Sequence, residues 1–238
     1  MLAVLVLFMA AFAAAAISGA AGFGGALLLL PLLIATVGPT QAVPLLTVAQ
    51  LVGNLARAGF GFNQIQWRPV GLFLLGALPM SVLGALSFVE LPKDVVTRAI
   101  GAAILVFVAL RFFGRLQLKA GAALLILGGG TAGFLSGLLG SAGPIGAAVF
   151  LTLGMPPVAY IASEATTALA MHGVKTLVYQ QFIVLDRAFW LLAGMLGVAM
   201  VLGTWAARRV IERMPQRLFQ HFVAILLGII GSYMLIHG

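Results

Sequence analysis

The sequence predicts an all-α integral membrane protein, and three observations support that class. Of the 238 residues, 63% are hydrophobic and only 8% are charged, whereas a soluble domain carries roughly a quarter charged residues. The first charged side chain is Arg57, and none lies between Lys119 and Glu164. Such stretches can cross a bilayer, which takes about 20 apolar residues per helix. We therefore expect about eight transmembrane helices together with shorter half-helices.

Ten apolar runs, separated by glycines, prolines and charged residues, supply these helices. In chain order they cover residues 2–20, 23–37, 41–61, 69–88, 94–113, 119–138, 143–153, 157–180, 188–207 and 215–236. We expect every run to be helical, because membrane-embedded backbone must satisfy its own hydrogen bonds. The Ala/Leu/Gly composition also lacks the alternation of a barrel strand.

Two of the runs, 23–37 and 143–153, are shorter than the others. At 1.5 Å per residue they fall short of a hydrocarbon layer of about 30 Å. We expect half-helices or re-entrant segments here, and the sequence leaves open whether they span the membrane.

Composition also excludes several classes of site and partner. Without cysteine the chain has no disulfide framework, iron–sulfur cluster or thiolate metal site. The net charge is +8, but the basic residues are dispersed between apolar runs. That pattern indicates membrane orientation and not nucleic-acid binding. The first 16 residues lack the basic region of a signal peptide, so we treat them as mature chain. We expect no cofactor, no metal and no nucleic acid, with the lipid bilayer and a small anion as partners.

An internal repeat divides the single domain into two halves. Residues 17–25, Ile-Ser-Gly-Ala-Ala-Gly-Phe-Gly-Gly, match residues 135–143, Leu-Ser-Gly-Leu-Leu-Gly-Ser-Ala-Gly, at an offset of 118 residues. The same offset aligns Asn54 and Arg57 with His172 and Lys175. We predict one transporter domain, residues 1–238, with repeats at 1–115 and 116–238.

The charge distribution predicts that the two repeats are inverted in the membrane. Each half holds five segments, and an odd number gives the halves opposite orientations. The odd-numbered connections carry eight Lys and Arg residues and the even-numbered ones only three. The odd set is Arg68, Arg111, Arg115, Lys119, Arg208, Arg209, Arg213 and Arg217, and the even set is Lys93, Arg98 and Arg187. Cytoplasmic loops are enriched in positive charge. We therefore expect the odd connections in the cytoplasm and both termini outside it, in a multi-pass protein of the inner (plasma) membrane.

Two glycine-rich breaks are candidate substrate-binding segments. The first comprises Gly22, Phe23, Gly24 and Gly25, and the second Gly140, Ser141, Ala142 and Gly143. Each precedes a short apolar run without an acidic residue in its first turn. Free backbone N–H groups and the helix dipole at such a helix start attract anions. Transporters with inverted repeats place their substrate at half-helices of this kind. The alternative is that these glycines only allow close helix packing.

The longest run of each half carries a polar face. Gln50, Asn54 and Arg57 lie at i, i+4 and i+7, and Glu164, His172 and Lys175 at i, i+8 and i+11. We expect Arg57 and Lys175, at matching positions, to bind an anion together with Asn54 and His172. Gln50 and Glu164 are candidates for coupling, with Glu164 carrying a proton or serving as counter-charge to Lys175.

Five of these six polar residues also have a structural alternative. The two cations could snorkel to the membrane interface, Asn54 could join helices, and His172 could be a packing residue. Glu164 could belong to a structural ion pair or be an interfacial acid close to the start of its helix.

The order of these motifs resembles the TauE/SafE family of sulfite exporters. The resemblance rests on the break at 22–25 followed by Pro31, on the Gly38-Pro39 turn, on the duplication, and on the number of apolar helices. It implies a secondary transporter of sulfite, thiosulfate, organosulfonates or related small anions, without ATP. The second half departs from the pattern, because it is poorer in glycine and has Val149 where the first half has Pro31.

We therefore expect an exporter of small sulfur-containing anions that works by alternating access. An anion channel, or a transporter of other small anions such as carboxylates, is the alternative. An intramembrane enzyme would need a nucleophile or metal motif, which the sequence lacks, and no nucleotide-binding loop is present. The anion, the direction of transport, the coupling ion and the oligomeric state, a homodimer included, are left open by the sequence.

Overall fold

The described residues fold mainly into helices, and no strand occurs among them. The structure is a computed structural model that describes residues 2–23, 25–87, 121–139, 143–179 and 186–237, with single positions at 98, 102, 105 and 109. The helices are α1 (Leu2–Ala21), α2 (Gly25–Val37), α3 (Pro39–Phe60), α4 (Trp67–Leu86), α6 (Ala122–Leu139), α7 (Gly143–Leu151), α8 (Pro157–Tyr179), α9 (Arg187–Ile211) and α10 (Gln216–His237). A single 3-10 turn, η1 (Phe62–Gln64), joins α3 to α4. The predicted all-α class is confirmed.

Glycine and proline set several helix boundaries. Gly22, directly after α1, has φ +88°, and Gly38, directly before α3, has φ +79°. Such backbone is easily reached only by glycine. Pro39 then opens α3, where its missing N–H costs nothing. The expected helix at 94–113 lies outside the described ranges apart from single positions.

Four of the described helices, α1, α4, α9 and α10, are long and apolar enough to cross a membrane. The shorter α2 and α7, with 13 and 9 residues, reach only about 20 and 14 Å at 1.5 Å per residue. These lengths agree with the half-helices expected from the sequence. The total of eight spans stays a prediction.

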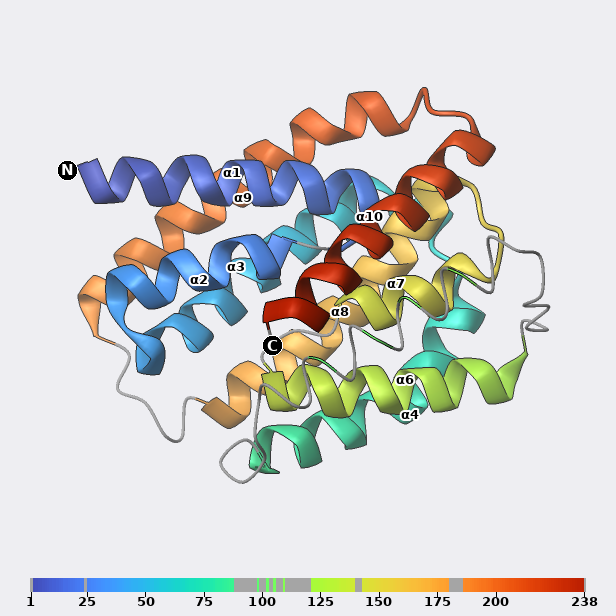
Figure 1. Ribbon diagram of the computed structural model, residues 1–238, viewed down its shortest axis with the longest axis horizontal. Coiled ribbons are helices and arrows are strands. Elements are labelled where there is room, and N and C mark those ends of the chain that lie inside the picture. The colour runs from blue at the N-terminus through green and yellow to red at the C-terminus, as the bar shows by residue number, and fades with distance from the viewer. Residues whose placement is uncertain are drawn as a thin grey trace.

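The helices of the two halves are interleaved (Figure 1). The first helix of each half packs on the fourth helix of the other: α1 lies on α9, and α6 lies on α4. Between these pairs α3 packs against α8, and α3 also contacts α9 while α8 contacts α4. The long, polar-faced helices therefore lie at the centre of the molecule.

Glycines bring α4 and α6 into backbone contact. A Cβ atom at Gly76 would lie 2.0 Å from the carbonyl oxygen of Ile126, and one at Gly129 would lie 2.1 Å from that of Phe73. Gly133 is equally close, 2.2 Å from the carbonyl oxygen of Ala77. Small residues allow such approach between membrane helices, where dispersion contacts drive packing. We call this α4–α6 contact the glycine seam.

Most of the arginines at the ends of the described helices lie at one end of the molecule. The start of α4, the start of α6 and the turn between α9 and α10 lie at one end in Figure 1, and the N-terminus and the start of α9 lie at the other. The first end receives Arg68 and the arginines from Arg208 to Arg217, all of which the sequence assigns to odd connections. Arg187 begins α9 at the opposite end. We call the arginine-rich end the basic end.

Candidate functional site

A small cavity of about 30 Å³ is lined by residues of both halves of the chain. We call it the central cavity. The start of α2, the start of α7, and the facing sides of α3 and α8 form its walls. Nine of the predicted site residues line it: Gly22, Phe23, Gly25, Gln50, Asn54, Arg57, Gly143, Glu164 and His172. Residues far apart in the sequence are thus brought to one place.

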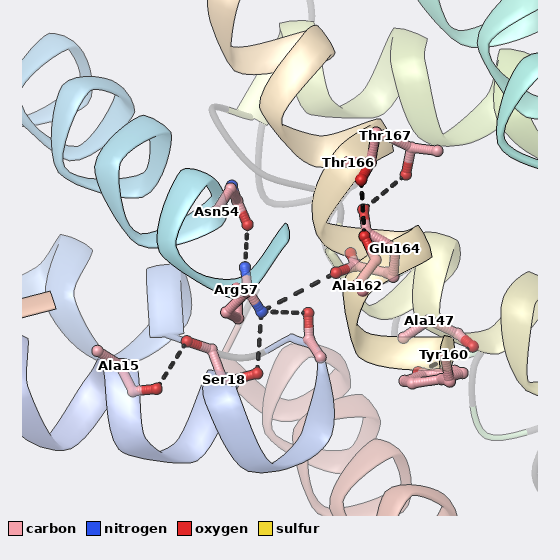
Figure 2. A network of polar contacts seen from close by, with 11 residues as sticks. Ala15, Ser18, Asn54, Arg57, Ala147, Tyr160, Ala162, Glu164, Thr166 and Thr167 are labelled. Carbon is pink, nitrogen blue, oxygen red and sulfur yellow. Dashed lines mark hydrogen bonds and ion pairs between the residues drawn. The ribbon is translucent and has the colours of Figure 1, made fainter. Parts of the chain in front are cut away.

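Arg57 holds the end of α1 against α3 (Figure 2). Its Nη1 donates to the carbonyl oxygens of Ser18, at 2.9 Å, and Gly22, at 2.6 Å. Its Nη2 donates to Oδ1 of Asn54, one turn earlier on α3. The last carbonyls of a helix have no partners inside it, and a cation there also meets the negative end of the dipole. At 5% exposure, Arg57 does not snorkel to the surface.

Lys175 does for α6 what Arg57 does for α1. Its Nζ donates to the carbonyl oxygen of Ser136 at 3.3 Å and to the hydroxyl of Ser136 at 2.9 Å. Both cations reach a serine carbonyl 39 residues earlier in the chain. Lys175 is fully buried, and Ser136, which it holds, lines the central cavity. Snorkelling is therefore wrong for Lys175 as well.

Glu164 joins the second half of the chain to the first. Its Oε2 lies 3.9 Å from Nη1 of Arg57, and both side chains are 4% exposed. The sequence suggested Lys175, on the same helix, as the counter-charge of Glu164, whereas the structure places Glu164 beside Arg57 on α3. Taking one partner away from such a buried pair is costly, because the remaining charge is left uncompensated.

Several buried donors around the central cavity have no hydrogen-bond partner among the described residues. They are Nε2 of Gln50, Nδ2 of Asn54, Nε of Arg57 and Nδ1 of His172, the last a donor in one of its tautomers. All four residues line the cavity. A buried polar group without a partner costs about 1–3 kcal/mol, so a ligand that accepts hydrogen bonds is favoured here.

The two short helices both begin at this cavity. Gly25 opens α2 and Gly143 opens α7, without an acidic residue in the first turn of either helix. Gly25 also has a packing role, since a Cβ there would lie 2.8 Å from the carbonyl oxygen of Ala14. A Cβ at Gly146 would make no such close contact. Its Cβ would meet Oε1 of Glu164 at 3.8 Å, an ordinary contact inside the cavity.

Four predicted site residues, Gly24, Gly140, Ser141 and Ala142, lie outside the described ranges. Sequence reasoning also missed two residues, Ser18 and Ser136, whose carbonyls hold the buried cations. A signal for them existed, because the two serines match within the repeated segments at the 118-residue offset.

The family model described as "Sulfite exporter TauE/SafE" matches residues 7–234. No curated protein and no solved structure matches the chain.

Proposed function

Because the chain belongs to the TauE/SafE family of sulfite exporters, which are membrane transporters and not enzymes, we propose that it exports small sulfur-containing anions through its central cavity. Sulfite, thiosulfate and organosulfonates are the proposed substrates. Each presents several oxygens that accept hydrogen bonds. The proposed location is the inner (plasma) membrane.

One observation carries the proposal: Gln50, Asn54 and Arg57, which each have a buried donor without a partner among the described residues, line the same cavity as the starts of α2 and α7. Amide N–H groups and helix starts stabilise negative charge without themselves carrying a full charge. An oxyanion in the cavity would satisfy donors that protein groups leave without partners.

The buried charges support an anionic ligand. Arg57 and Lys175 are positive and Glu164 is negative, and all three are buried. When all three are ionised, one positive charge is in excess, and charge inside a membrane is costly unless it is balanced. An anionic ligand in the cavity would offset it.

Alternating access between inverted halves is the mechanism that we propose. In Figure 1 the equivalent helices α1 and α6 run in opposite directions, as do α4 and α9. The central cavity is lined by both halves, and a cavity of about 30 Å³ holds little more than water. Rocking of one half against the other would enlarge it toward each side in turn.

Flux into proteoliposomes tests the function. The purified chain is reconstituted, and uptake of labelled sulfite, thiosulfate, methanesulfonate and acetate is measured with and without a pH gradient. We expect saturable transport of the sulfur anions and slower transport of acetate. Dependence on the gradient would identify the proton as the coupling ion.

Two results would contradict the proposal. Folded protein that moves none of the sulfur anions would remove the function. Unsaturable flux faster than a carrier can turn over would replace the transporter with an anion channel.

A further inference from the structure

A second cavity lies between the central cavity and the basic end. It is formed where the ends of α1, α3 and α9 meet the start of α8. Its lining includes Phe60 and Gly61 at the end of α3 and just after it, and Thr204, Arg208 and Glu212 at the end of α9 and just after it. We call it the access cavity.

Arg57 is shared by the two cavities. It is the one described residue that lines both of them. Its guanidinium is held by the carbonyls of Ser18 and Gly22 and by the side chain of Asn54. Arg57 is therefore the described residue at which the central and access cavities meet.

Three polar residues follow one face of α9 along the access cavity. Thr204, Arg208 and Glu212 are spaced four residues apart, which places them one above another on the helix. Thr204 is 4% exposed, and its hydroxyl has no partner in the described part of the chain. A buried hydroxyl on a cavity wall favours a ligand that can accept its hydrogen bond.

Arg208 lies at the outer rim of this cavity in a defined orientation. Its guanidinium carbon lies 5.3 Å from the centre of the Phe60 ring, within the range of a cation–π contact. Its Nε donates to Glu212 Oε1 at 2.5 Å, and the two side chains are 43% and 42% exposed. Arg208 is the cation that an incoming anion would meet first, and Glu212 is already paired with it.

We propose that the access cavity is the path by which the anion enters from the basic end, with Arg208 as the receiving cation, Thr204 as an intermediate hydrogen-bond donor, and Arg57 as the partition before the central cavity. Glu212 competes with the anion for Arg208. The proposal rests on the proposed transport function and adds to it a route and a residue that receives the anion. Because the basic end is predicted to be cytoplasmic, this route would load an exporter.

Opposite effects of two neutral variants test the rim. For sulfite transport by the reconstituted full chain, Arg208→Gln should raise KM about three- to tenfold and weaken its dependence on ionic strength, because a rim charge acts mainly on the association rate. Glu212→Gln should lower KM by about twofold or more, because it frees Arg208. An ion pair with only a structural role predicts the same direction for both variants, with a lower melting temperature in each.

Arg209→Gln is the matched control for net charge. Arg209 is the neighbouring exposed arginine, and its guanidinium carbon lies 4.4 Å from the centre of the Trp205 ring instead of lining the access cavity. We expect its KM to equal that of the wild-type chain. A shift as large as that of Arg208→Gln would assign the effect to general surface charge and overturn the proposal.

A chemical test of the path needs no transport. The chain has no native cysteine, so a Thr204→Cys variant can be alkylated with anionic iodoacetate or neutral iodoacetamide. We expect iodoacetate to react from the basic end and not from the other face. The rate of alkylation by iodoacetate divided by the rate with iodoacetamide should fall several-fold when Arg208→Gln is added. The same ratio should rise when Glu212→Gln is added.

The outcomes separate the route from the function. Failure of the wild-type chain to move any sulfur anion would contradict the function, and the alkylation ratios would still test the route. Normal transport, with alkylation ratios that ignore both rim variants or with reaction only from the far face, would overturn the route and leave the function standing.

Discussion

Arg57 and Lys175 are buried cations that each hold the end of a helix. Each holds the last carbonyls of the first helix of its own half, at Ser18 and at Ser136. These contacts compensate for burying the charge, which costs several kcal/mol without partners. The same contacts fix the end of the helix that leads into the glycine-rich break. A substitution therefore disturbs the backbone as well as the charge, and tests of these residues need a stability measurement.

The Arg57–Glu164 pair allows the two roles to be separated. Arg57→Gln alone leaves Glu164 buried without its counter-charge, so we expect a loss of about 3–5 kcal/mol in the free energy of unfolding. Adding Glu164→Gln should recover most of that loss, because no uncompensated charge remains. Anion transport should stay low in the double variant. Denaturant titration in detergent and flux assays measure the two properties, and full transport by the double variant would assign Arg57 a purely structural role.

Asn54 gives a sharper test, because its two amide atoms have different partners. Oδ1 accepts from Arg57, whereas Nδ2 has no partner among the described side chains and backbone groups. Asn54→Asp keeps the acceptor for Arg57 and replaces the donor with an anionic oxygen. We expect unchanged or higher stability with sulfite affinity reduced at least tenfold, since a hydrogen bond to a charged group contributes about 1.5–3 kcal/mol.

Substrate-induced thermal stabilisation measures that affinity, because it depends on binding to the folded state. The control is Asn54→Leu, which removes both contacts and should lower stability and affinity together. Undiminished sulfite binding by Asn54→Asp would place the anion elsewhere.

At the scale of elements, glycines act in two different ways. In the glycine seam they allow contact between backbones, and a methyl group at Gly76 would overlap Ile126. Gly146 instead leaves space in the central cavity, where a methyl group fits beside Glu164. Gly194, at the repeat position that matches Gly76, would have nothing within 4 Å of its Cβ. The role of each glycine therefore depends on what surrounds it in the fold.

These differences predict three distinct phenotypes. Gly146→Ala should lower transport severalfold with little change in melting temperature, because it fills the cavity without displacing backbone. Gly76→Ala should lower the melting temperature and the yield, since α4 and α6 must separate. Gly194→Ala should resemble the wild-type chain. Melting curves and flux assays of the three proteins check this, and a strongly destabilised Gly146→Ala protein would contradict the cavity assignment.

The helices that the structure describes were predictable from sequence, with boundaries within a few residues. Uncharged runs bounded by Gly22, Gly38 and charged residues leave little choice of where a membrane helix begins or ends. Helical periodicity also predicted that the polar residues of α3 lie on one face of that helix, and likewise those of α8. The contact of Glu164 with Arg57 was not predictable, because it depends on how α3 and α8 pack. The serine carbonyls were missed because every residue carries the same carbonyl group.

At the scale of the whole molecule, the arrangement of the helix ends predicts which connections lie on the same side of the membrane. Arg68, the second residue of α4, and Arg213, between α9 and α10, are both exposed at the basic end. Arg187, the first residue of α9, is exposed at the opposite end. Single cysteines at positions 68 and 213 should react with an impermeant maleimide from the cytoplasmic side, and one at 187 from the opposite side. The absence of native cysteine keeps the background low. Reaction of all three from one side would rule out the predicted topology.

The interleaving of the halves has a consequence for how the chain can be divided. Because α1 packs on α9 and α6 on α4, each half covers apolar surface that belongs to the other. A polypeptide that ends near residue 115 would lack the partners of its own first and fourth helices. We expect two co-expressed fragments, 1–115 and 116–238, to co-purify as a functional complex, while either one alone is degraded. The covalent link between the halves would then not be required for folding. Each half would behave as a subunit that folds only together with the other.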